Sequence, residues 1–133
     1  MTGVSSALRI AAYIAPAILG AAHSAHAQTK AKSAAPDTSV VTDKLIAEGR
    51  SVFRGHGGCI VCHGQNLEGI VGPTLKAHKW KDAENGDFKA IIRVVSSGVP
   101  GTVMVSHPNG VSDDQIVAVA AYIWGVNHGR TKP

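Results

Sequence analysis

The segment GGCIVCHGQN at residues 57–66 contains both cysteines of the chain, Cys59 and Cys62, and a histidine directly after the second one. A cysteine pair with this spacing is compatible with a disulfide, a zinc site, a dithiol redox site or haem attachment. A disulfide between the two would close a loop of only a few residues and would add little stability. The rest of the sequence has to distinguish the other three.

A structural zinc site needs four ligands, usually from two cysteine pairs or from one pair and spaced histidines. This chain has one pair, and His56 and His63 lie too close to it to form a typical second half. A thioredoxin-like pair needs a strand–helix frame, which the sequence pattern does not show. Cys-x-x-Cys-His is the attachment signature of a c-type haem, because thiols one helical turn apart reach two vinyl groups of one porphyrin edge. We therefore predict one covalent haem c on Cys59 and Cys62, with His63 as an iron ligand.

The second iron ligand has one methionine candidate besides the initiator. Met104 lies in GVPGTVMVSHPNG, residues 98–110, and a lone methionine more often simply fills space in a core. Here the segment is rich in glycine and proline, follows the haem histidine and precedes the last predicted helix. His/Met is a known cytochrome ligand pair, so we predict Met104 as the second ligand. His107 and His78 remain alternatives.

Apolar periodicity predicts an all-α domain with three main helices. Their boundaries follow from caps and glycines: the first begins after Thr42 or Asp43 and ends at Gly55–Gly58, the second runs from about Asp87 to Gly98, and the third begins at the capping box Ser112–Gln115 and ends at Gly125 or Gly129. The stretch 63–86 shows no period. A loop of that length is unusual in a small domain unless it wraps a ligand.

The N-terminal region predicts export. Residues 1–27 combine Arg9, a short apolar stretch and a small-x-small cleavage site, the pattern of a secretory signal peptide. We expect cleavage near Ala27, a flexible tail at 28–41, a folded domain at 42–129 and a periplasmic location. Arg9 is the only charged side chain in the signal, so cleavage lowers the formal net charge from +4 to +3. This mild basicity favours acidic protein partners. The sequence has no arginine-rich stripe of the kind that nucleic-acid binding needs, so we expect no nucleic-acid partner.

Together these features resemble a class I c-type cytochrome over residues 44–127, and they are similar to the monohaem domains found beside bacterial periplasmic dehydrogenases or fused to haem–copper oxidase subunits. The segments that carry the resemblance are GRSVFRGHGGCIVCH (49–63), GPTL (72–75), GVPGTVM (98–104) and DDQIVAVAAYIWGVNH (113–128). The resemblance implies the cytochrome c fold, with helices wrapped around the haem. It also implies that Gly49 and Phe53 meet Tyr122 where the first and last helices cross. Val105 departs from the family, which often has proline there, and this predicts a less rigid methionine loop.

The resemblance implies further site residues around the haem. The carbonyl of Pro73 would hold the Nδ1–H of His63 and so fix the ring and its tautomer. Leu75 would pack on the haem, and Trp80 and Arg93 would contact its propionates. For Trp80, an ordinary half-buried loop aromatic is the alternative interpretation.

Histidine and thioether together saturate the iron, so the predicted function is electron transfer between a dehydrogenase and a terminal oxidase or other acceptor, not catalysis. The soft sulfur ligand favours reduced iron and raises the potential. Lys76, Lys79 and Lys81 lie close together and predict an acidic redox partner, although charged loops are often merely solvated. The alternatives are a dedicated cytochrome subunit of a dehydrogenase complex, and a haem enzyme or gas-binding protein in which Met104 dissociates.

Overall fold

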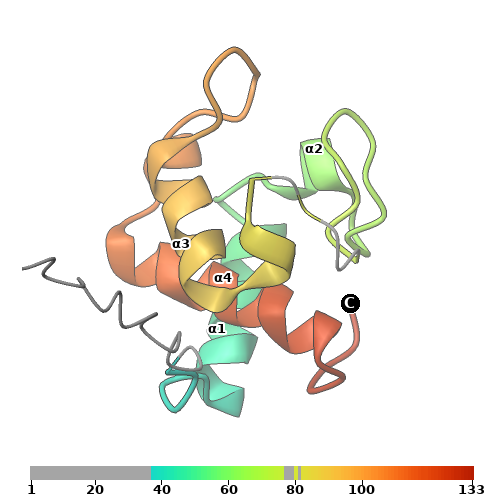
Figure 1. Cartoon of the computed structure of the whole chain (residues 1–133). Helices are drawn as coiled ribbons and strands as arrows, with labels where there is room; N and C mark the ends of the chain where they lie inside the picture. Colours follow the sequence, from blue (N-terminus) through green and yellow to red (C-terminus); the bar gives the residue numbers. More distant parts are fainter. Residues whose placement is uncertain (1–36, 77–79, 81) are drawn as a thin grey trace, which may run out of the picture. The chain divides into compact units, whose positions relative to one another are not determined.

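The structure is a computed structural model that describes residues 37–76, 80 and 82–133, all within one structural unit, residues 33–133. The elements are the α-helices α1 (Asp43–Arg54), α2 (Ile60–His63), α3 (Phe88–Ser97) and α4 (Asp113–Asn127), and the 3-10 turns η1 (Glu84–Gly86) and η2 (Pro108–Gly110) (Figure 1). The described residues contain no strand, as the all-α prediction requires. In the same residues, no helix has the length and apolar character needed to cross a membrane. The predicted signal peptide lies outside the described residues.

The three predicted helices are α1, α3 and α4, but the count of three is not confirmed, because α2 adds a fourth. The third helix ends at Gly129, one of the two predicted glycines, which follows the cap residue His128 with a φ of 69°. Gly125 lies inside α4 and is buried, and a Cβ atom there would lie 2.9 Å from Cδ1 of Ile46. This glycine therefore makes room for a side chain of α1, and α4 continues to Asn127.

Local capping chemistry sets the starts of α1 and α4. The Thr42 hydroxyl accepts a hydrogen bond from the backbone N–H of Leu45 (3.1 Å), which satisfies one of the free donors at the start of α1. At α4, Ser112 and Gln115 form a full capping box, since each side chain accepts a hydrogen bond from the other residue's backbone N–H. The sequence predicted both starts because a cap depends only on residues within one turn.

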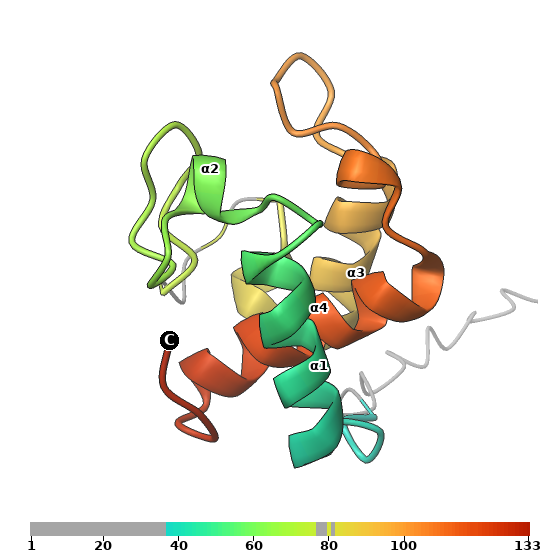
Figure 2. The ribbon, with the colours of Figure 1, turned by 180° about the vertical axis from the view of Figure 1, so that it is seen from behind.

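α1 and α4 cross at close range, and Gly49 makes this possible. A Cβ atom at Gly49 would overlap the backbone carbonyl of Ala118 in α4. One turn further along α1, the rings of Phe53 and Tyr122 meet edge to face, with centroids 5.5 Å apart and both side chains fully buried. The predicted helix crossing is confirmed, and Figure 2 shows α1 passing across α4. The glycine itself faces Ala118 in place of Tyr122.

α3 packs against α4 and completes the core. Its buried face has the predicted helical spacing, with Phe88, Ile91 and Val95 all less than 7% exposed. Val41, the last residue of the predicted tail, is also in the core, and its carbonyl accepts a hydrogen bond from Arg130 (2.9 Å). The packed part of the chain therefore includes Val41.

Candidate functional site

The cysteine pair and its histidine lie on one helical turn. The backbone N–H of His63 donates to the carbonyl of Cys59 (2.9 Å), so that α2 spans the second half of the motif. Cys59 and Cys62 are both half-buried free thiols, and no disulfide joins them. One helical turn therefore carries both thiols and the histidine. Burial raises the pKa of the Cys59 thiol to about 11, so this thiol is protonated at neutral pH in the polypeptide.

The ring of His63 is held in a fixed orientation. Its Nδ1 lies 2.9 Å from the carbonyl oxygen of Pro73, the contact that the family resemblance implied. A carbonyl can only accept, so Nδ1 carries the proton and Nε2 is left with its lone pair for a metal. Gly72 lies under the same ring, because a Cβ atom there would be 2.7 Å from Cε1 of His63. Any side chain at Gly72 would displace the imidazole, a role that sequence reasoning missed although it used the GPTL segment.

The loop after His63 is tied back to the haem motif by its own backbone. The N–H groups of Ile70 and Gly72 both donate to the carbonyl of Cys62, at 3.0 and 2.9 Å. Leu67 anchors the loop with a fully buried side chain and a positive φ of 61°. So long a loop was expected to be ordered by a ligand inside it, but these hydrogen bonds to Cys62 supply part of its order.

Leu75, the predicted haem-packing residue, is half-buried and packs against the core. Its carbonyl accepts a hydrogen bond from the Asn127 side chain (2.7 Å), which also donates to the carbonyl of Ile123 (2.9 Å). Asn127 thereby joins the end of α4 to the loop that carries Pro73 and Leu75. The sequence offered no signal for this contact except a polar residue at the end of an apolar helix.

Met104 lies on the loop between α3 and α4. The side chain is half-buried and packs against the core. Its backbone is held on both sides, because its carbonyl accepts from the N–H of Val99 (2.8 Å) and its own N–H donates to Oγ1 of Thr102 (3.1 Å). Gly98 ends α3 with a φ of +71°, and a Cβ atom there would be 2.7 Å from the Met104 carbonyl oxygen.

Of the two alternative iron ligands, His107 is engaged elsewhere. Its Nδ1 lies 2.8 Å from Oγ of Ser106, and its Nε2 lies 3.0 Å from Oδ1 of Asp113. Iron ligation by His107 would therefore break one of these contacts. His78, together with Lys79 and Lys81 of the predicted docking cluster, lies outside the described residues.

Trp80 and Arg93, the two residues expected to contact the haem propionates, differ in burial and in their hydrogen bonds. Trp80 is half-buried, packs against the core, and has a buried Nε1–H with no hydrogen-bond partner among the described residues. A buried donor without an acceptor is costly, so this indole fits an external acceptor such as a carboxylate. Arg93 is exposed and forms an ion pair with Glu84 (2.7 Å). Exposed pairs of this kind contribute about 0–1 kcal/mol, so the pair leaves the arginine available to another anion.

These residues fit a covalently bound haem better than the other candidates for a cysteine pair. The fit rests on two free thiols on one turn, an imidazole with its Nε2 left for iron, and the unpaired indole N–H of Trp80. In the described part of the chain, no group of three or more His, Cys, Asp or Glu side chains is placed to bind a metal ion. The strand–helix frame of a dithiol redox site is also missing from these residues.

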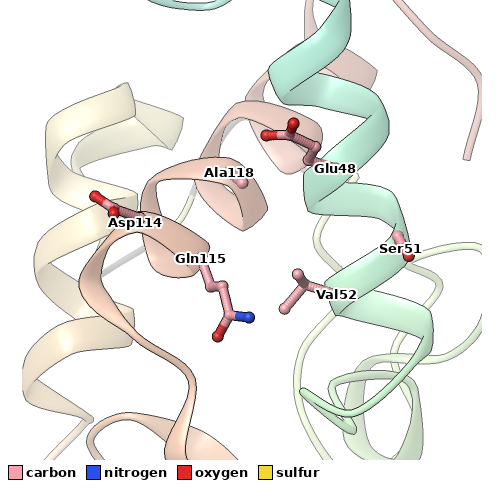
Figure 3. Close-up of a pocket in the computed structure, with 6 residues that line it drawn as sticks. All are labelled: Glu48, Ser51, Val52, Asp114, Gln115 and Ala118. Carbon is pink, nitrogen blue, oxygen red and sulfur yellow. The ribbon is translucent and has the colours of Figure 1, made fainter.

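A separate hollow of about 320 Å³ lies between α1 and α4. Figure 3 shows the side chains that line it: Glu48, Ser51, Val52, Asp114, Gln115 and Ala118. None of them was predicted as a site residue. The hollow follows from the close helix crossing, and the candidate site is built from the loops and from α2.

Comparison with known proteins places residues 44–123 in the family described as cytochrome c oxidase, cbb3-type, subunit III. Cytochrome c-551 of Bacillus subtilis (strain 168) is 31% identical over 91 residues, which cover 68% of this chain and 71% of the relative.

Solved structures show the same architecture. Cytochrome cL from Methylophaga aminisulfidivorans matches with a TM-score of 0.56 and 27% identity, over 63% of this chain and 54% of the other. Cytochrome c6 from the diatom Phaeodactylum tricornutum matches with a TM-score of 0.53 and 25% identity, over 63% of this chain and 95% of the other. Cytochrome cL from Hyphomicrobium denitrificans matches with a TM-score of 0.54 and 26% identity, over 62% of this chain and 47% of the other. The matches thus cover about half the length of the two cytochromes cL.

Proposed function

Because the chain belongs to the cbb3-type subunit III family of class I c-type cytochromes, we propose that it is a periplasmic carrier that passes single electrons from a dehydrogenase to a terminal acceptor. Membership of this family implies a covalently bound haem c and an electron-transfer role. The cofactor supplies the reversible one-electron chemistry, and the chain supplies ligands, orientation and exclusion of water. The observation that carries the proposal is the 2.9 Å contact between Nδ1 of His63 and the Pro73 carbonyl, which reserves Nε2 for iron.

We assign the site as follows. Cys59 and Cys62 would attach the haem, and His63 and Met104 would be the ligands of its iron. Pro73 holds the imidazole in one tautomer, which also makes it a stronger ligand. Leu75 excludes water beside the haem, and Trp80 donates its unpaired N–H to a propionate, with Arg93 as a weaker second contact. With two ligands supplied by the protein, the iron would be left no open position for a substrate, and its bound chemistry would be one-electron transfer.

The first prediction is that the haem stays on the polypeptide when the protein is denatured in acidified organic solvent. The double variant Cys59→Ala/Cys62→Ala should release essentially all of its haem, because both thioether bonds are then absent. The measurement is haem absorbance in the extracted and protein-bound fractions. Each single variant should retain haem through its remaining thiol. Free extraction from the unaltered protein would contradict covalent attachment.

The second prediction concerns the basic segment at 76–81, of which the structure describes the exposed Lys76. Changing Lys76, Lys79 and Lys81 to Gln should slow reduction by the native donor at low salt and flatten the salt dependence. Exposed charges act mainly on the association rate of the two proteins, and salt screens their interaction beyond about 10 Å at 0.1 M. The reduction potential should barely change, because no ligand is altered. Stopped-flow reduction across a salt series is the measurement.

Lys44→Gln, Lys89→Gln and Lys132→Gln together make a matched control with the same loss of charge outside this segment. Wild-type rates and an unchanged salt slope in the 76–81 variant would place the docking face elsewhere. The exposed apolar side chains of Val103 and Val105 on the methionine loop would then be the next candidates.

A dedicated subunit of a dehydrogenase complex is the second candidate, since it would use the same ligands. Purification from the native source distinguishes the two. Co-elution with one dehydrogenase through several steps would support the subunit, and separation in the first step would support the free carrier.

A further inference from the structure

His107 connects three elements near the methionine loop. Its Nδ1 contacts Oγ of Ser106 (2.8 Å), and its Nε2 contacts Oδ1 of Asp113 (3.0 Å), the first residue of α4. The Ser106 hydroxyl in turn donates to the carbonyl of Ser96 (2.7 Å), near the end of α3. Ser106 is two residues after Met104. This chain of bonds therefore ties the loop, just past the proposed iron ligand, to both flanking helices.

The three bonds are compatible only with a doubly protonated ring. The Ser106 hydroxyl has one hydrogen, and donation to Ser96 leaves its oxygen as an acceptor, so Nδ1 of His107 must carry a proton. The Asp113 carboxylate accepts only, so Nε2 must carry one too. A neutral imidazole satisfies at most two of the three bonds. The number of bonds that tie down the loop therefore depends on the protonation of His107.

Few charged groups among the described residues contact the His107 side chain. Asp113 is the charged group bonded to the ring among the described residues. The bonds from α3 are made by uncharged carbonyls: that of Ser96 accepts from the Ser106 hydroxyl, and that of Val95 accepts from the backbone N–H of His107 (3.2 Å). Asp114, the next residue of α4, lines the hollow toward α1. Within the loop, Val103 and Val105 are 72% and 59% exposed, so they hold Met104 in place only weakly.

We propose that His107 is a positioning residue for Met104: by bonding Ser106 and Asp113 it keeps the methionine loop closed against the iron, most firmly when the ring is protonated. The proposal rests on Met104 being the sixth ligand. The relevant property is the rate at which Met104 leaves ferric iron. The chain of bonds should slow that rate, and loss of a proton from His107 should raise it.

Cyanide binding to the ferric holoprotein tests this, because at saturating cyanide the binding rate equals the rate of Met104 release. His107→Phe should raise the limiting rate up to about fivefold, the upper effect of losing an exposed pair, and His107→Gln, which keeps one donor, should raise it less. Asp113→Ala removes the acceptor of the Nε2 bond and should also raise the limiting rate. His128→Gln, at the other end of α4, is the matched control.

The far-red absorption band of thioether-ligated ferric haem separates this inference from the proposed function. If the unaltered protein lacks the band, Met104 is not the ligand and both fail. If the band is present but His107→Phe and Asp113→Ala both keep the wild-type limiting rate, only the role of His107 is overturned. Ser106→Ala removes a bond of the same chain without replacing His107, whose backbone has a φ of 45°. This variant should also raise the rate of Met104 release. An unchanged rate in Ser106→Ala would contradict the tie to α3.

Discussion

Met104→Ala is expected to lower the reduction potential by a few tenths of a volt, within the roughly 0.8 V that axial ligands span in haem proteins. The thioether is a soft ligand that favours ferrous iron, and the oxygen ligand that would replace it favours ferric iron. The variant should also bind carbon monoxide in the ferrous state, which the six-coordinate protein should do only slowly. Spectroelectrochemical titration and carbon monoxide difference spectra are the measurements.

Met104→His should remain six-coordinate and still have a lower potential, because imidazole replaces the softer sulfur. Val103→Ala is the matched control, since it changes an exposed side chain of the same loop without touching a ligand. Unchanged spectra and potentials in both Met104 variants would mean that another residue binds the iron. Because His107 is bonded to Ser106 and Asp113, His78 would then be the first candidate.

Gly49→Ala is expected to destabilise the holoprotein by about 3 kcal/mol, the upper range for overpacking in a core. The new Cβ would overlap the carbonyl of Ala118, and this is backbone of a packed helix that cannot rotate away. Alanine has a better helix propensity than glycine by about 1 kcal/mol, which offsets only part of the cost. Equilibrium unfolding in guanidinium chloride, followed by helical circular dichroism, is the measurement.

Gly125→Ala is the matched control for Gly49→Ala. It lies in the partner helix of the same crossing, but its Cβ would meet the flexible end of the Ile46 side chain. A rotation of Ile46 can relieve this contact, so the loss should be small beside that of Gly49→Ala. Equal stability of Gly49→Ala and the unaltered protein would show that α1 and α4 do not approach as closely as described.

The parts of the fold that sequence reasoning predicted correctly depend on short-range chemistry. The starts of α1 and α4 follow from side chains that cap their own first turn, as Thr42 and Ser112 do. The buried face of α3 follows from a helical period. The Phe53–Tyr122 contact was also expected, but only from the resemblance to a family, since nothing local links residues so far apart.

Errors in the sequence analysis arose where distant segments meet. Either Gly125 or Gly129 was expected to end the last helix, because glycine is a common terminator. Gly129 does so, whereas Gly125 lies inside α4 and makes room for Ile46. The loop after His63 shows no period, and its bonds to Cys62 are made by backbone groups, which carry no sequence signal. The short helix α2 was missed because so short an element has no periodicity.

For the candidate site, the sequence by itself determined the class of chemistry. Cys59, Cys62 and His63 lie within five consecutive residues, and a covalent haem needs only that spacing. The tertiary structure alone decided how the candidate site residues are supported: Gly72 lies under the imidazole of His63, Asn127 holds the loop at Leu75, and His107 is bonded to Asp113. Most of these contacts join residues that only helix packing brings together. A hydrogen bond or a van der Waals contact acts over a few ångströms, so which residues form it is decided by the fold and not by the local sequence.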